Sequence, residues 1–184
     1  EVKSIINYYN NLEYLRLDNN AVNNLELVES LHGNRFKNNL FSILDKCSTA
    51  MGSRFLKNSI LYPLVDLVKI NERLDFIKEL HKNYIITEEL KRILTEVYDL
   101  ERLCGRISLG SANGRDLIQL KNSLQVLPEI NNILKEIGYK QLEDVSELYN
   151  LLNSSLYETP PVTLKEGYLI KEGYNTELDE YRKL

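Results

Sequence analysis

The stretch that decides the fold is ILDKCSTAMGSRFL, residues 43–56. Leu40, Ile43 and Leu44 share one face of a short helix before the polar segment of this stretch. A second apolar face begins at Phe55 and Leu56 and ends before Pro63, because proline disfavours helix at the residue that precedes it. The stretch therefore predicts two short helices joined by a polar turn.

Helical periodicity continues along most of the chain. Asp18 and Asp66 are good N-caps for two of the expected helices. Apolar residues three and four apart, with charged residues between them, predict an amphipathic helix over residues 67–80. Further helices are expected over the ranges 87–100, 115–137 and 142–156, with a Gly- and Ser-rich break at 105–114. Pro128 is expected to kink or divide the helix over 115–137.

Two apolar faces of these helices are expected to form the core. They are Leu67, Ile70, Leu74 and Ile77 on one helix, and Leu117, Leu120 and Leu124 on another. A charged residue in a packed core is strongly destabilising, so Leu74→Asp is predicted to abolish folding.

The pattern changes near the end of the chain. Residues 162–164 and 168–170 flank Gly167, which predicts a small β-hairpin over 162–170. Thr176 and Asp179 have the spacing of a capping box, so residues 176–184 are expected to begin another helix. The expected fold class is mainly α, a multi-helix domain with one short β-hairpin near its C-terminus.

The composition excludes some classes of protein. The 184 residues carry a formal net charge of −4, whereas a free-standing nucleic-acid binder usually has a basic surface. No apolar run approaches the roughly 18–20 residues of a membrane span, and no signal peptide is visible. Cys47 and Cys104 are isolated thiols, which fits a reducing, intracellular environment. The chain starts with Glu1 and its one methionine is Met51, so we expect a piece of a longer protein.

The sequence offers few groups for catalysis. His32 lies in an expected turn and His81 at an expected helix end, and we interpret both as surface residues. The sequence has no Gly-x-x-x-x-Gly-Lys-Ser/Thr phosphate loop and no Gly-x-Ser-x-Gly nucleophile elbow. We therefore expect no catalytic, cofactor-binding or metal-ligating residue in this sequence.

One charged cluster allows two interpretations. In the first, Asp99 and Glu101 form a carboxylate pair for acid–base or metal chemistry. In the second, these carboxylates form an ion-pair cluster on one helix with Arg102 and Arg106. The i, i+3 and i, i+4 spacings favour ion pairs.

Direct contact with DNA is a further hypothesis. Three cations would line a strip that faces phosphates, and three tyrosines would stack on bases. Basic residues interleaved with acidic ones, however, usually form a solvated face, and tyrosines at helical spacing usually pack half-buried, so the structural explanation is favoured. The residues are Lys46, Arg54, Lys57, Tyr8, Tyr9 and Tyr14.

Several sequence blocks occur in an order that characterises a known family. They are Leu17-Asp18, Asn24-Leu25-Glu26-Leu27, Leu44-Asp45 with Met51-Gly52-Ser53-Arg54, Tyr62-Pro63-Leu64, Ile70 with Arg73, Asp99-Leu100-Glu101-Arg102-Leu103, Arg106-Ile107, Asn113-Gly114-Arg115-Asp116-Leu117, Thr159-Pro160-Pro161, Gly167, Gly173-Tyr174-Asn175 and Leu178-Asp179. Taken in order, they closely resemble the core domain, or domain III, of the bacterial MutS family of DNA mismatch-repair proteins. The chain departs from the family's usual residues at Cys47, Ala50, Ser59 and Gly114, where the family often has threonine, proline, tryptophan and proline.

The resemblance implies a specific role. Residues 1–184 would be a core fragment, with residues 176–184 starting a lever helix that leads to a DNA-gripping clamp outside the sequence. In this family the core links mismatched-DNA binding and the clamp to an ATPase, so the fragment is expected to be non-catalytic. The parent protein would use ATP and Mg²⁺, bind mismatched double-stranded DNA, form a homodimer and recruit MutL. It would act in DNA repair in the cytoplasm, at the nucleoid when bound to DNA.

Other interpretations stay open. A helical protein-interaction scaffold unrelated to repair would carry an apolar groove for a peptide. A MutS relative that acts in recombination would share the same core. A small enzyme would need an acid, base or metal set that the sequence lacks.

Overall fold

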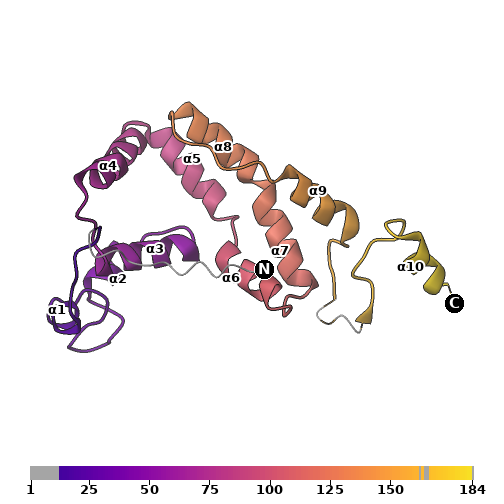
Figure 1. Ribbon diagram of the computed structural model, residues 1–184, viewed down its shortest axis with the longest axis horizontal. Coiled ribbons are helices and arrows are strands. Elements are labelled where there is room, and N and C mark those ends of the chain that lie inside the picture. The colour runs from indigo at the N-terminus through magenta and orange to yellow at the C-terminus, as the bar shows by residue number, and fades with distance from the viewer. Residues whose placement is uncertain (1–12, 162, 164–165, 184) are drawn as a thin grey trace. The chain divides into compact units, whose positions relative to one another are not determined.

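The computed structural model describes residues 13–161, 163 and 166–183, and it is mainly helical as the sequence predicts (Figure 1). The chain divides into two compact units, Glu1–Arg92 and Ile93–Leu184. None of the helices in the described part combines the length and the apolar character needed to cross a membrane.

The first unit is built from short and medium helices. They are α1 (Asn19–Asn24), α2 (Leu40–Leu44), α3 (Ala50–Leu61), α4 (Leu67–Lys82) and most of α5 (Tyr84–Leu94). Asp18 Oδ1 accepts the Ala21 N–H at 2.6 Å and Asp66 Oδ1 accepts the Val68 N–H at 2.8 Å. These hydrogen bonds confirm both predicted N-caps. Each carboxylate satisfies an amide group that the start of a helix leaves unpaired.

The start of α5 differs from the prediction. The helix begins at Tyr84, three residues before Thr87. The Thr87 hydroxyl instead donates to the Leu80 carbonyl at 2.6 Å, which ties α5 to the last turn of α4. Thr87 therefore bonds outside its own helix and does not cap it.

The apolar face of α4 is not a core face in this chain, and that expectation was wrong. Leu67, Leu74 and Ile77 are 73%, 55% and 57% exposed. Leu27 is the one buried apolar side chain among the described residues of the first unit. Periodicity identifies which face of a helix is apolar, but it does not say whether another element covers that face.

The second unit has a packed core around α7. Its helices are α6 (Leu100–Ser108), α7 (Gly114–Gln125), α8 (Leu127–Glu136), α9 (Ser146–Ser155) and α10 (Thr176–Tyr181). Helix α7 contacts α6, α8 and α9 (Figure 1). The buried cluster consists of Leu103, Leu120, Leu124, Leu152 and Leu156. The predicted packing face of α7 is therefore confirmed, with Leu117 packed against its edge.

Pro128 divides the long helical pattern, as predicted. Val126 is the C-cap of α7 and also the N-cap of α8, and Pro128 lies in the first turn of α8. A first-turn N–H has no partner inside its helix, so proline is tolerated there.

Three other boundaries differ from the predictions. The Gly- and Ser-rich break is shorter, because α6 continues through Gly105 to Ser108 and Gly114 is already the first residue of α7. Helix α9 begins at Ser146, not at residue 142. Helix α10 is capped by Asn175, whose Oδ1 accepts the Leu178 N–H at 3.0 Å, and not by Thr176.

The end of the chain contains one antiparallel bridge among the described residues near it. Ile170 pairs with Leu156, and the Tyr157 N–H donates to the Leu169 carbonyl at 3.1 Å. The hairpin expected over 162–170 depends on residues 162, 164 and 165, which lie outside the described residues. The bridge fastens the segment after this region to the end of α9.

Candidate functional site at the turn between α6 and α7

The first element of the site is the capped start of α6. Asp99 Oδ1 accepts the Arg102 N–H at 3.2 Å, and Asp99 Oδ2 lies 3.4 Å from Arg102 Nε. This geometry confirms the ion-pair interpretation for these two residues. The Arg102 side chain is 78% exposed, and exposed pairs of this kind contribute little to stability.

The second element is the turn that ends α6. Gly110 has a φ of +66°, a left-handed conformation that glycine adopts without steric cost. The Ser111 N–H donates to the Arg106 carbonyl at 2.9 Å, and the Ser111 hydroxyl donates to the same oxygen at 3.2 Å. The Arg106 carbonyl, in the last turn of α6, is thereby satisfied within the turn.

The third element is a capping box at the start of α7. Asn113 Oδ1 accepts the Asp116 N–H at 3.0 Å, and Asp116 Oδ2 accepts the Asn113 N–H at 2.8 Å. The reciprocal bonds satisfy two amides that the helix leaves unpaired. They also fix the Asp116 carboxylate at the positive end of the helix dipole, where negative charge is favoured.

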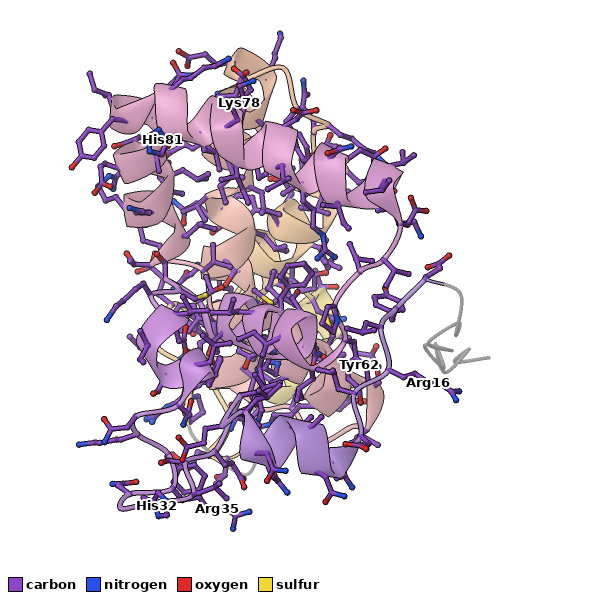
Figure 2. All side chains as sticks on the ribbon, turned by 90° about the vertical axis from the view of Figure 1, so that its left-hand side faces the viewer. Arg16, His32, Arg35, Tyr62, Lys78 and His81 are labelled. Carbon is purple, nitrogen blue, oxygen red and sulfur yellow. The ribbon has the colours of Figure 1, made fainter. Side chains whose placement is uncertain are left out.

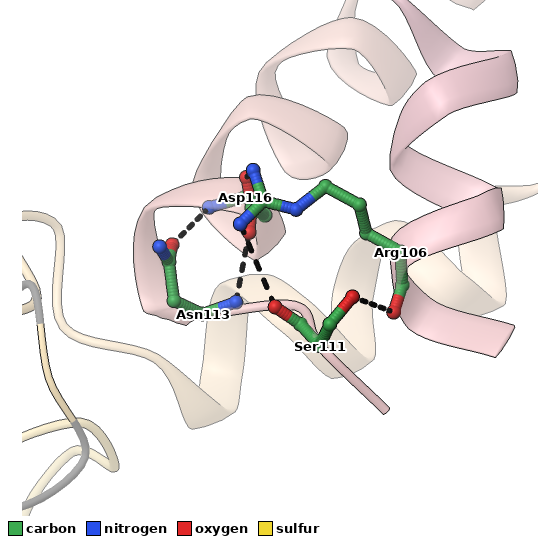
Figure 3. A network of polar contacts seen from close by, with 4 residues as sticks. All are labelled: Arg106, Ser111, Asn113 and Asp116. Carbon is green, nitrogen blue, oxygen red and sulfur yellow. Dashed lines mark hydrogen bonds and ion pairs between the residues drawn. The ribbon is translucent and has the colours of Figure 1, made fainter. Parts of the chain in front are cut away.

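An ion pair joins these elements. Arg106 Nη1 lies 2.9 Å from Asp116 Oδ1, and Arg106 Nη2 donates to the Ser111 carbonyl at 3.5 Å (Figure 3). The Asp116 side chain is 8% exposed and that of Arg106 is 49% exposed. Both carboxylate oxygens of Asp116 are engaged, one with the backbone of its own helix and one with α6. The pair therefore fixes the last turn of α6 to the first turn of α7.

Gly114 allows a further segment to approach this turn. A Cβ built on Gly114 would lie 2.5 Å from Leu169 Cδ1 and 2.7 Å from Pro160 Cβ. Real Cβ atoms do not show distances this short, so in this chain a side chain at position 114 would force Leu169, Pro160 or the start of α7 to move. Three separated sequence blocks, around residues 106, 113–117 and 159–161, therefore meet at one place.

Sequence reasoning missed this network. It grouped Arg106 with Arg102 on one helix face, whereas the partner of Arg106 is Asp116 on the next helix. The available signal was the spacing of Asn113 and Asp116, which is that of a capping box. A capping box fixes the direction of a carboxylate, but the partner across the turn follows only from the three-dimensional path of residues 109–113.

The remaining candidates are dispersed. His32 and His81 are exposed and lie at separate places on the first unit, as Figure 2 shows. Lys46 and Lys57 are exposed, whereas Arg54 is half-buried. Tyr14 is half-buried and pairs with Leu64 in an antiparallel bridge; Tyr8 and Tyr9 lie outside the described residues.

Metal-binding groups do not gather in the part of the chain that the structure describes. No cluster of three or more His, Cys, Asp and Glu side chains with metal-site geometry occurs there. Cys47 and Cys104 are both free thiols. Burial, followed by a hydrogen bond to Asp45, raises the pKa of the Cys47 thiol, which makes its nucleophilic thiolate rarer.

A second local network lies at the start of α3, within residues 43–56. Asp45 Oδ2 accepts the Ser53 hydroxyl at 2.6 Å, and Asp45 Oδ1 accepts the Cys47 N–H at 3.2 Å. Thr49 caps the helix by accepting the Gly52 N–H at 3.0 Å. The hydrogen bond from Ser53 is the main cause that lowers the pKa of Asp45.

We expect Ser53→Ala to raise the pKa of Asp45 towards the ordinary value of an aspartic acid, because the hydroxyl bonds to the charged form. A carboxyl with a lowered folded-state pKa stabilises the fold above its unfolded pKa and loses that contribution as the pH falls through the folded value. The variant should therefore lose less stability than the parent below the ordinary aspartate pKa. NMR titration of the Asp45 carboxyl carbon measures the shift.

Ser59→Ala is the matched control for this titration. The Ser59 hydroxyl lies on the same helix and donates to the Phe55 carbonyl at 2.8 Å, away from Asp45. An Asp45 pKa that is the same in both variants would contradict the assigned cause.

Comparison with known families decides the identity of the chain. The sequence profile of MutS domain III matches residues 20–184. The chain belongs to the MutS domain III family. The match includes the Arg106–Asp116 network and the complete second unit.

Several curated relatives of this MutS domain III chain are named DNA mismatch repair protein MutS. The protein of Clostridium tetani is 40% identical over 181 residues, which are 95% of this chain and 20% of the relative. The Clostridium kluyveri protein is 42% identical over 183 residues, 96% of this chain and 21% of the relative. The Halothermothrix orenii protein is 42% identical over 185 residues, which are 97% of this chain and 21% of the relative. The chain therefore spans about a fifth of the length of the relatives it matches.

Proposed function

We propose that this MutS domain III segment is the non-catalytic structural core of a mismatch repair MutS protein. In that role it links the region that binds mismatched DNA, and the clamp, to the ATPase domain of the same polypeptide. The observation that carries the proposal is the Arg106–Asp116 pair, which fixes two helices to each other at a turn built from family motif residues.

The chemistry of the pair suits transmission of movement. A half-buried ion pair adds modest stability, but it restricts the angle between the elements it joins. Helices that are fixed to one another move as one body, so a displacement at one end reaches the other. A link of this kind needs no acid, base or metal of its own.

The partners proposed for the longer protein follow from the family. It would use ATP and Mg²⁺, bind mismatched double-stranded DNA, form a homodimer and recruit MutL in the cytoplasm. The exposed face of α4, with Leu67, Leu74 and Ile77, would pack against parts of the longer protein outside this segment, because a large apolar face is usually covered in the functional assembly.

Arg106→Gln in the full-length protein tests the linking role. We expect basal ATP hydrolysis to stay within about twofold, while its response to mismatched DNA falls about fivefold or more, the size of a typical allosteric coupling. Glutamine keeps a polar side chain at a half-exposed site, so the loss would come from the missing ion pair. Steady-state ATPase assays with and without a mismatched duplex measure both quantities.

Arg102→Gln is the matched control, because Arg102 lies on the same helix and its ion pair is largely exposed. Equal responses to mismatched DNA in both variants and the parent would contradict the linking role. Equal affinity of the parent for mismatched and fully paired duplexes would instead assign the protein to a recombination branch of the family.

A further inference from the structure

A groove lies in the second unit between α8 and the segment that leads into α9. It has a volume of about 400 Å³, which is within the range of binding pockets. Its apolar lining consists of Leu124, Leu127, Pro128, Leu142, Val145 and Tyr149. Leu124 also belongs to the buried core, so the floor of the groove rests on packed structure.

The outer wall of the groove is held in place by one side chain. Asn131 Nδ2 donates to the Leu142 carbonyl at 3.1 Å, and Asn131 Oδ1 accepts the Leu142 N–H at 2.7 Å. The amide thus satisfies both backbone groups of Leu142, as a neighbouring strand would. The Leu142 side chain itself is 47% exposed at the groove. A groove fixed in this way needs little rearrangement to accept a ligand.

The rim of the groove carries one sign of charge. Glu143 and Asp144 line it, and no Lys, Arg or His belongs to its described lining. Hydrogen bonds from the Ser146 N–H and then from the Ser146 hydroxyl lower the pKa of Asp144, which keeps it ionised at neutral pH. The sequence of the second unit also has 15 acidic and 10 basic residues. The local field therefore favours a positively charged partner.

We propose that this groove binds a short segment of a separate partner protein, in which apolar side chains are flanked by lysines or arginines. The apolar side chains would enter between Pro128, Leu142 and Tyr149, and the flanking cations would face Glu143 and Asp144. A small apolar centre with a polar rim is the anatomy of a transient interface. The apolar face of α4 differs in this respect, because its helix carries lysines and an arginine as well as acidic residues, so its surroundings are not of one sign.

A defined peptide tests the proposal on the full-length protein. The probe is a fluorescein-labelled peptide with two leucines flanked on each side by two lysines, and the comparison peptide replaces each lysine with glutamate. We expect the basic peptide to bind with an affinity that falls as salt rises, and the acidic peptide to bind at least about tenfold more weakly. Fluorescence anisotropy measures both.

Three variants test whether the peptide binds in the groove. Leu142→Lys should weaken binding of the basic peptide about tenfold or more, and Glu143→Lys about fivefold, because one removes an apolar anchor and the other reverses a rim charge. Leu148→Lys is the control: Leu148 is 41% exposed on α9 but does not line the groove. The control should bind within about twofold of the parent.

Three results would overturn the proposal. The first is equal weakening by Leu148→Lys and Leu142→Lys, and the second is the absence of peptide binding to the parent. The third is failure of a maleimide to label residue 142 in the Leu142→Cys full-length protein, since the groove would then be covered by the same polypeptide. Peptide mass spectrometry locates the label, because Cys47 and Cys104 are also free thiols. None of these results bears on the linking role, which is read from the ATPase response.

Discussion

Leu120→Asp is expected to unfold the second unit of the chain. Leu120 is 7% exposed and packs in the cluster with Leu103, Leu124, Leu152 and Leu156. An aspartate there would bury a carboxyl among leucines without a partner, and the packing of the leucine would be lost as well. We expect the free energy of unfolding to fall by about 4 kcal/mol or more. Urea unfolding followed by circular dichroism, with hydrogen exchange measured on α7, checks this.

Leu74→Asp is the matched control, with the same change on α4. Leu74 is 55% exposed, so its aspartate would remain in water and the unfolding free energy of the chain should change by no more than about 0.5 kcal/mol. Equal losses of unfolding free energy in the two variants would contradict the difference in burial between Leu74 and Leu120. In the full-length protein, loss of repair by Leu74→Asp with an intact fold would show that the α4 face packs on another part of the molecule.

The contrast between α4 and α7 shows what periodicity can predict. Both helices were expected from apolar residues three and four apart, and both exist. Caps such as Asp18 and Asp66 were predictable because the bond they make lies within three residues of the cap. Whether an apolar face is buried depends on residues far away in the sequence, and therefore only one of the two faces was correctly assigned to the core.

The candidate site shows the same limit. The Asp99–Arg102 pair was predictable, because i, i+3 residues on a helix are neighbours. The Arg106–Asp116 pair was not, because it depends on the turn at Gly110 that brings two helices together. The spacing of Asn113 and Asp116 indicates a capping box, so this part of the site could be predicted from the sequence. The ion pair with Arg106 across the turn could not.

Gly114→Val is expected to lower the free energy of unfolding by about 2–3 kcal/mol, the usual range for overpacking a tight contact. The first carbon of the new side chain would meet Leu169 Cδ1 at 2.5 Å and Pro160 Cβ at 2.7 Å. The end of the leucine can rotate away, but the proline ring is rigid, so the backbone at Pro160 or the start of α7 must move. Hydrogen exchange should show increased opening of the Asn113–Asp116 capping box, and chemical denaturation gives the loss of stability.

Gly105→Ala is the control that separates crowding from the general effect of replacing a glycine. Gly105 lies within α6, and a Cβ built there has no neighbouring atom within 4 Å. Alanine restricts the unfolded chain and favours helix, so this variant should be as stable as the parent or more stable by about 0.5–1 kcal/mol. If Gly114→Val were as stable as Gly105→Ala, the close approach of Pro160 to α7 would be absent in solution. If only Gly114→Val is destabilised, and the response of ATP hydrolysis to mismatched DNA falls with it in the full-length protein, the place where the three sequence blocks meet is needed for both folding and coupling.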